Sequence, residues 1–149
     1  MRNTSDWKER LPSENWVLFC FANEEDEDLL AEVVGDCLEK RVSCIYCAGE
    51  IAYKAELDFD IGIVNHWGSS IDSRSYHPLT TASKNFDEEF WDAASLTYDP
   101  CGKIKKVICL NLNKKGIKQY LISLIDKVND PEWIPSEETI LYPSYDQAE

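Results

Sequence analysis

The feature that most constrains the fold is an uninterrupted apolar run at residues 16–22, Trp-Val-Leu-Phe-Cys-Phe-Ala. A strand with one wet face alternates apolar and polar residues, whereas a run without alternation is typical of a strand covered on both faces. Asn23 follows at once, and after it come five acids and then apolar residues at helical spacing. A doubly covered strand that leads into an amphipathic helix predicts an α/β layer fold.

The same alternation continues along the chain. Residues 23–41 are expected to form a helix, with acids near its positive amino end and Lys40 and Arg41 near its negative carboxyl end. Two further strands are expected. One is the mostly apolar segment at residues 42–48, which a glycine follows, and the other is the segment at residues 104–112, which contains the apolar run Val107-Ile108-Cys109-Leu110. Two more helices are expected after polar residues that suit helix caps, Asn85 and Asn113.

Strands joined through helices by short connections give right-handed crossovers and a mostly parallel sheet. We therefore predict an α/β fold of two or three layers around a mostly parallel sheet of about four strands, of the flavodoxin-like or Rossmann-like kind. The length of 149 residues predicts a single domain, residues 1–149, of which residues 143–149 are expected to fray.

Two parts of the chain have weaker patterns. Residues 50–58 suit a short helix, and residues 60–65 look more like a short strand. Residues 66–84 are rich in Ser, Thr, His and Gly and are expected to form a long loop, a kind of segment that is often functional in compact domains. Residues 139–142 suit a short edge strand.

Net charge, one turn motif and the lack of long apolar runs argue against several classes of function. The 28 acids and 15 Lys and Arg give a net charge of −13, which disfavours nucleic acid and anionic lipid as partners. The turn after the first strand, Ala22-Asn23-Glu24-Glu25, has carboxylates where a dinucleotide site has its glycine fingerprint, so no nucleotide cofactor is expected there. The sequence contains no apolar run of membrane-spanning length and begins without the apolar stretch of a signal peptide. We therefore expect a cytoplasmic protein that binds no membrane and no cofactor.

The cysteines favour structural roles. Cys20 and Cys109 lie in apolar strand-like runs, where a free thiol acts as a small hydrophobic group. Cys44 and Cys47 form a C-x-x-C motif, but within a strand residues three apart face opposite sides. Together with His66 and His77 they have no recognised zinc-ligand spacing, so no metal site is expected from them. Residues 24–28 are likewise interpreted as the acidic first turn of a helix and not as metal ligands, because consecutive helical side chains fan outward.

One constellation resembles an enzyme site. Asp58 and Asp60 would share a face if the chain were extended there, and His66 follows. Near the carboxyl edge of a parallel sheet, such carboxylates could hold Mg²⁺ while the histidine moves a proton, with Glu50 in support. The competing interpretation is a loop in which Asp side chains bind local backbone, since no nucleophile or phosphate-binding motif accompanies them.

A second constellation favours binding. Trp67, Arg74 and Tyr76 lie in the long loop, and these residue types are enriched at protein-binding hot spots. They could equally pack beneath the loop. Acidic side chains in two helices would complete a binding surface: Glu24, Glu25, Asp26, Glu88 and Glu89.

Several segments also carry a resemblance to known proteins. They are the Trp-led first strand at residues 14–22, the aromatic and Cys-containing strand at residues 43–49, and the blocks at residues 77–81 and 86–91. In these the chain resembles, over roughly residues 14–128, a family of small bacterial α/β proteins of unknown function. The resemblance implies the fold and no activity.

These observations leave three hypotheses open. The first is a non-catalytic protein-binding protein, specifically an immunity-type inhibitor that neutralises a bacterial toxin through an acidic surface. The alternative is a metal-assisted hydrolase or nucleotide-processing enzyme that uses Asp58, Asp60 and His66. The third is a self-associating scaffold, for which the outlying aromatic residues are candidates: Trp7, Trp133 and Tyr145.

Overall fold

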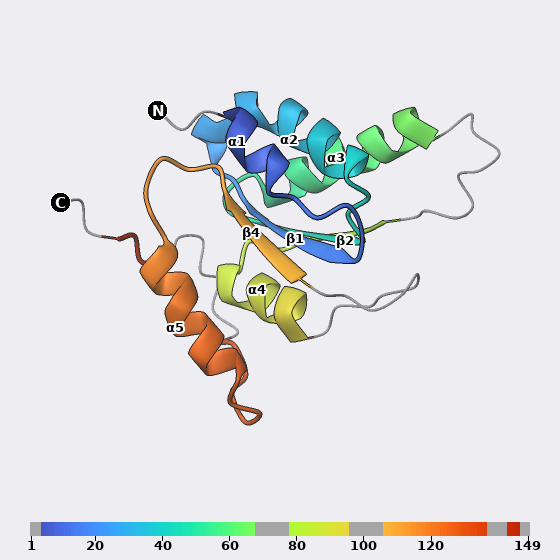
Figure 1. The fold of residues 1–149 in the computed structure, drawn as a ribbon. Coiled ribbons are helices and arrows are strands. Elements are labelled where there is room, and N and C mark those ends of the chain that lie inside the picture. Colours follow the sequence, from blue (N-terminus) through green and yellow to red (C-terminus); the bar gives the residue numbers. More distant parts are fainter. Residues whose placement is uncertain (1–3, 68–77, 96–105, 137–142, 147–149) are drawn as a thin grey trace.

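The computed structural model describes residues 4–67, 78–95, 106–136 and 143–146 (Figure 1). The described helices are α1 (Thr4–Glu9), α2 (Glu27–Glu39), α3 (Ala52–Trp67), α4 (Phe86–Ser95) and α5 (Lys118–Val128), with a 3-10 turn η1 (Glu24–Asp26) before α2. The described strands are β1 (Trp16–Phe21), β2 (Cys44–Ala48), β3 (Leu79–Ala82) and β4 (Lys106–Asn111). None of these helices is both long and apolar enough to span a bilayer.

The four described strands form one parallel sheet in the order β3-β2-β1-β4. The prediction of an α/β fold with a parallel sheet of about four strands is confirmed. Strand order 3-2-1-4 is that of the first strands of a Rossmann fold. The order reverses between β1 and β4, because the chain moves outward from β1 to β3 and then returns to the other side of β1.

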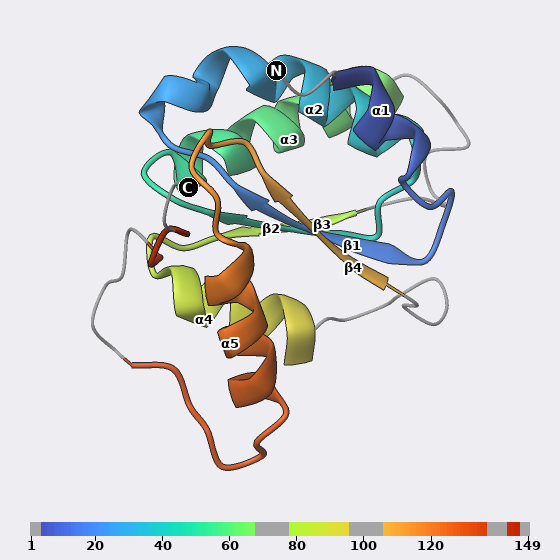
Figure 2. The ribbon, with the colours of Figure 1, turned by 60° about the vertical axis from the view of Figure 1, so that its left-hand side comes forward.

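Burial of β1 explains its unbroken apolar sequence. All six of its residues are buried, because β2 and β4 flank it and helices cover both faces of the sheet. Trp16, Leu18 and Cys20 pack with α2 and α3, whereas the alternate residues pack with α4 and α5. Figure 2 shows the resulting three layers, with α1, α2 and α3 on one side of the sheet and α4 and α5 on the other.

The C-x-x-C motif lies within β2, and its two cysteines belong to different cores. Cys44 packs on the α4 side and Cys47 on the α2 and α3 side. Both thiols are buried, and burial raises the pKa of Cys47 well above its usual range. The prediction that these two side chains point apart as structural residues is confirmed.

The middle of the chain differs from the prediction. The expected short strand at residues 60–65 is wrong, because α3 continues through it from Ala52 to Trp67. The expected loop at residues 66–84 is also wrong at both ends, since α3 reaches into it and Leu79–Ala82 forms the edge strand β3. A tetrapeptide without a continuous apolar run can be a strand here because β2 supplies its backbone partners along one edge. The expected strand at residues 139–142 lies outside the described residues.

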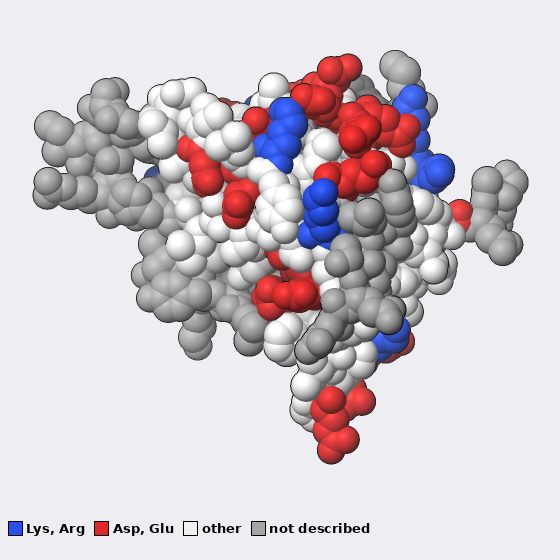
Figure 3. All heavy atoms as spheres, turned by 180° about the vertical axis from the view of Figure 1, so that it is seen from behind, with Lys and Arg blue, Asp and Glu red and all other residues white. Residues whose placement is uncertain are grey.

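β3 forms one edge of the sheet, between α3 and α4. Its threonines alternate, so that the Thr80 hydroxyl donates to Asp60 Oδ1 on α3 over 2.6 Å and the Thr81 hydroxyl donates to Glu89 on α4. Figure 3 shows the molecule from behind, with several separate groups of acidic side chains on a mostly uncharged surface.

The C-terminal segment is held against the domain over its described residues, contrary to the expected fraying from residue 143. Pro143 is buried, and the Tyr145 ring lies 6.5 Å from that of Phe21. The Asp146 carboxylate accepts hydrogen bonds from the backbone N–H groups of Lys118 (3.0 Å) and Gln119 (2.9 Å). Asp146 therefore caps the amino end of α5 from 27 residues farther along the chain.

Removing this cap is expected to destabilise the protein. Asp146→Ala leaves two amide groups of α5 without their acceptor and should lower the free energy of unfolding by about 1 kcal/mol. Asp146→Asn retains an oxygen acceptor and should lose about half as much. Asp126→Ala, which removes the same charge from the exposed face of α5, should change stability by less than about 0.5 kcal/mol. Urea denaturation of the three variants measures these differences, and equal losses from Asp146→Ala and Asp126→Ala would contradict the capping role.

Candidate functional site

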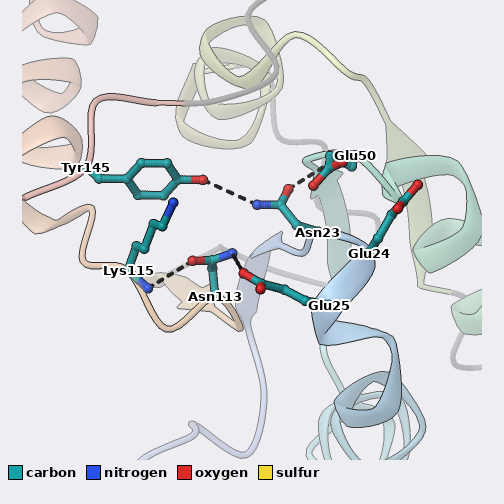
Figure 4. Close-up of a pocket in the computed structure, with 7 residues that line it drawn as sticks. All are labelled: Asn23, Glu24, Glu25, Glu50, Asn113, Lys115 and Tyr145. Atoms are coloured by element: carbon teal, nitrogen blue, oxygen red, sulfur yellow. Dashed lines mark hydrogen bonds between the residues drawn. The ribbon is translucent and has the colours of Figure 1, made fainter.

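An open cleft of about 740 Å³ lies at the carboxyl edge of the sheet (Figure 4). Its walls come from the segments that follow β1, β2 and β4 and from the C-terminal segment. This is where the strand order reverses, the position at which open α/β sheets bind their ligands. The lining residues are Asn23, Glu24, Glu25, Glu50, Asn113, Lys115 and Tyr145.

Asn23 organises this cleft. It follows β1 and is buried, and its backbone N–H donates to Asp26 Oδ2 over 2.9 Å at the start of the next helix. Its side-chain Oδ1 accepts the backbone N–H of Glu50 at 3.1 Å, and its Nδ2 donates to the Tyr145 hydroxyl over 3.3 Å. One amide side chain therefore joins three segments that are distant in the sequence.

Gly49 permits the close approach of the two turns that follow β1 and β2. Its backbone has a φ of +104°, in the region that favours glycine, and a Cβ at this position would lie 2.2 Å from the carbonyl oxygen of Ala22. The same approach brings Glu50 beside Asn23. The glycine is therefore required for the geometry of the cleft.

The opposite wall follows β4. The Asn113 Nδ2 donates to Glu25 Oε1 over 2.8 Å, and its Oδ1 accepts the backbone N–H of Lys115 at 2.9 Å. The Lys115 ammonium lies 4.9 Å from the centre of the Tyr145 ring, a cation–π arrangement. The cleft thus contains a cation held over an aromatic face among carboxylates.

Negative charge dominates the cleft. Glu24, Glu25 and Glu50 line it with Lys115 as the single basic lining residue, and within the described part of the chain none of the three carboxylates forms an ion pair. Burial raises the pKa of the Tyr145 hydroxyl, and the nearby Glu50 and Glu25 raise it further. A cleft with this charge favours a cationic ligand and disfavours a phosphate.

The structure separates the residues that the sequence suggested for binding. Glu24 and Glu25 line the cleft, but Asp26 is buried beneath it as the partner of the Asn23 backbone. Glu88 and Glu89 lie on α4, away from the cleft, and of these Glu88 is exposed. Trp67 ends α3 and its side chain, like all of Arg74 and Tyr76, lies outside the described residues.

Glu89 is buried in the interior, contrary to its expected place on a binding surface. Only 2% of its surface is exposed, and its carboxyl accepts the Thr81 hydroxyl between α4 and β3. Burial raises the pKa of Glu89 to about 7, and the charges of Asp92, Glu56 and Glu88 contribute in the same direction. This side chain is therefore an interior acid that changes its charge near neutral pH.

The structure does not bring the two aspartates of the enzyme-like constellation together. Asp58 and Asp60 lie two residues apart on α3 instead of on an extended segment, so their side chains diverge. The Asp58 Oδ2 pairs with the Lys54 ammonium at 3.0 Å, whereas Asp60 accepts the Thr80 hydroxyl. His66 lies in the last turn of the same helix, and its side chain is outside the description. Within the described ranges, no three His, Cys, Asp or Glu side chains are grouped so as to hold a metal ion.

Sequence reasoning did not assign four of the seven lining residues to a ligand-binding site: Asn23, Asn113, Lys115 and Tyr145. Asn23 and Asn113 were interpretable as helix caps alone, although both follow a strand closely, where ligand-binding residues gather in parallel sheets. The sequence suggested Tyr145 only as an outlying aromatic residue for self-association, because it joins the cleft through a hydrogen bond to a residue 122 positions earlier. No protein-family model, no curated protein and no solved structure is significantly similar to this chain.

Proposed function

We propose that this protein is a non-catalytic binding protein whose cleft accepts a cationic side chain of a protein partner. The observation that carries the proposal is that three glutamates, Glu24, Glu25 and Glu50, line one open cleft at the reversal point of the sheet with a single basic residue among the lining. A guanidinium or ammonium group of a ligand would form charge-assisted hydrogen bonds with these carboxylates and neutralise their charge. An immunity-type inhibitor that neutralises a basic bacterial toxin is the function that this chemistry supports best.

Lys115 supports this choice of ligand. Its ammonium already lies over the Tyr145 ring, which is the arrangement that a guest cation would adopt in its place. The net charge of −13 would also speed the approach of a basic partner at low salt, as in other electrostatically steered complexes. The free cysteines among the described residues are compatible with a reducing compartment, and we place the protein in the cytoplasm on that basis.

A triple variant tests the proposal. The probe is an octa-arginine peptide, titrated calorimetrically at low salt into the protein and into the variant Glu24→Gln, Glu25→Gln, Glu50→Gln. Three partly exposed contacts between these glutamates and arginines of the peptide together contribute about 1.5 kcal/mol to the binding free energy. The variant should therefore bind the peptide about tenfold more weakly. The control variant Glu9→Gln, Glu14→Gln, Glu32→Gln removes the same number of charges from exposed positions outside the cleft.

The control should retain most of the affinity. Equal losses in the two variants would contradict a specific site, because they would show attraction to the overall charge alone. Spermidine in a parallel titration distinguishes the source of the cation. Tighter one-to-one binding of spermidine than of the peptide would contradict a protein partner and indicate a free cationic compound as ligand.

A further inference from the structure

Helix α3 exposes an apolar stripe beside the cleft. It consists of Tyr53, Leu57, Ile61 and Val64, which are 58%, 56%, 49% and 65% exposed. Their spacing of four, four and three residues places them on one side of the helix. We call these four residues the α3 stripe.

The opposite side of α3 is already buried. Ala52, Ala55 and Phe59 pack in the core against the sheet, and Gly62 lets α2 approach so closely that a Cβ there would lie 2.6 Å from Val34. A helix that packs one face on its own sheet and has large apolar side chains on the other is typical of a helix covered on both sides. Among the described residues, none buries the α3 stripe, which is therefore available to a partner.

Charged residues along the stripe indicate what would cover it. Glu56 and Asp60 lie along one flank, and along the other Asp58 and Glu27 share the single ammonium of Lys54, at 3.0 and 3.1 Å. On the face of the molecule drawn in Figure 3, acidic side chains occupy more of the surface than basic ones. An apolar ridge between carboxylates complements an apolar surface edged with lysine or arginine.

The α3 stripe begins close to a cleft residue in the sequence. Glu50, which lines the cleft, is followed only three residues later by Tyr53, the first residue of the stripe. A partner segment that lies along the stripe and extends beyond the amino end of α3 would therefore approach Glu50.

We propose that the α3 stripe is the docking surface for a basic amphipathic helix of the partner protein. Its apolar face would lie on the stripe, its flanking cations would meet the carboxylates, and one cation at its end would enter the cleft. The inference rests on the proposed function, because it assumes the same cationic partner. A second copy of this chain fits less well, since two identical stripes would bring their acidic flanks together.

The test uses two peptides of 18 residues with the same composition of Leu, Lys and Arg. One has leucines at helical spacing with the cations on either side, and the other is a scrambled sequence without an apolar face. Fluorescence anisotropy should show at least tenfold tighter binding of the amphipathic peptide. The variant Leu57→Gln, Ile61→Gln should reduce that affinity to the level of the scrambled peptide.

A matched control distinguishes binding at the α3 stripe from nonspecific hydrophobic binding. The control variant Ile122→Gln, Ile125→Gln removes two apolar side chains of similar exposure, 44% and 48%, from α5 on the other side of the sheet. It should leave the affinity for the amphipathic peptide unchanged.

One outcome would overturn the stripe inference and leave the proposed function standing. In that outcome both peptides bind equally well, the triple Glu variant of the cleft binds both more weakly, and the stripe variant binds both as tightly as the wild type. If neither peptide binds, both fail. A dimer in sedimentation experiments that the stripe variant dissociates would assign the stripe to a second copy and overturn the inference.

Discussion

Glu89→Gln is expected to raise the free energy of unfolding at pH 8 by on the order of 3 kcal/mol. The pKa of this buried carboxyl is raised from 4.5 to about 7, chiefly by burial. At pH 8 the folded protein therefore holds a charge in its interior that the unfolded chain exposes to water. Glutamine has nearly the same shape, can still accept the Thr81 hydroxyl through its Oε1, and carries no charge.

The sign of the pH dependence follows from the same shift. Between pH 4.5 and 7 the folded state holds a proton on Glu89 that the unfolded state has lost, so the stabilising contribution of that proton falls as pH rises. It is fully present below pH 4.5 and absent above about pH 7. A shift of this size corresponds to on the order of 3 kcal/mol, since one pKa unit is about 1.4 kcal/mol.

Urea denaturation of the protein and of Glu89→Gln at several pH values between 4.5 and 8 measures this effect. The difference between the two stabilities should be small at pH 4.5 and largest at pH 8. Glu88→Gln, on the exposed side of the same helix turn, is the control and should shift stability by less than about 0.5 kcal/mol at any pH. A difference between wild type and Glu89→Gln that is constant with pH would show that Glu89 is ionised throughout in the folded protein.

Gly49→Ala is expected to lower the free energy of unfolding by at least about 3 kcal/mol. Two effects add: the backbone strain of a non-glycine residue at a φ of +104°, about 1–3 kcal/mol, and a Cβ that would lie 2.2 Å from the Ala22 carbonyl oxygen. Since the obstructing atom belongs to the backbone of the neighbouring turn, it moves only if the turns after β1 and β2 separate. Separation would also break the hydrogen bond from the Glu50 N–H to Asn23 and widen the cleft.

Gly35→Ala is the matched control, because it adds the same methyl group to a helical position with no atom within 4 Å. It should stabilise the protein by up to about 1 kcal/mol, the usual difference between alanine and glycine within a helix. Urea denaturation of both variants measures the effects, and calorimetry with the octa-arginine peptide should show weaker binding to Gly49→Ala alone. Equal stabilities of the two variants would show that the close approach at Gly49 is not needed.

Much of the fold was predictable because its central elements carry their own signals. The unbroken apolar run of β1 indicated a strand between two covered faces, and the cysteines of β2 indicated a strand whose sides belong to different cores. The predictions failed at α3 and β3, where local patterns mislead. α3 has apolar residues on both sides, so no single stripe marks it as a helix. β3 is a strand of only four residues, two of them threonines, and it depends on β2 for its backbone partners.

The candidate site was predictable only in part. Glu24 and Glu25 follow the first strand, where a parallel sheet places its ligand-binding residues, and the sequence alone singled them out. Asp26 and Glu89 have the same chemistry but face the interior, and exposure is decided by which elements pack over a side chain. The suggested trio of Asp58, Asp60 and His66 depended on an extended backbone that α3 does not have.

The amino-acid sequence by itself therefore determined the layered α/β architecture, the acidity of the surface and the absence of a phosphate-binding turn, because each of these follows from local pattern or from composition. Only the tertiary structure decided that Tyr145 and Asn23 meet in one cleft, that Glu89 is an interior acid and that the α3 stripe is left exposed. These features depend on contacts between residues far apart in the chain. The free energy of such contacts comes from packing and burial, which no window of neighbouring residues contains.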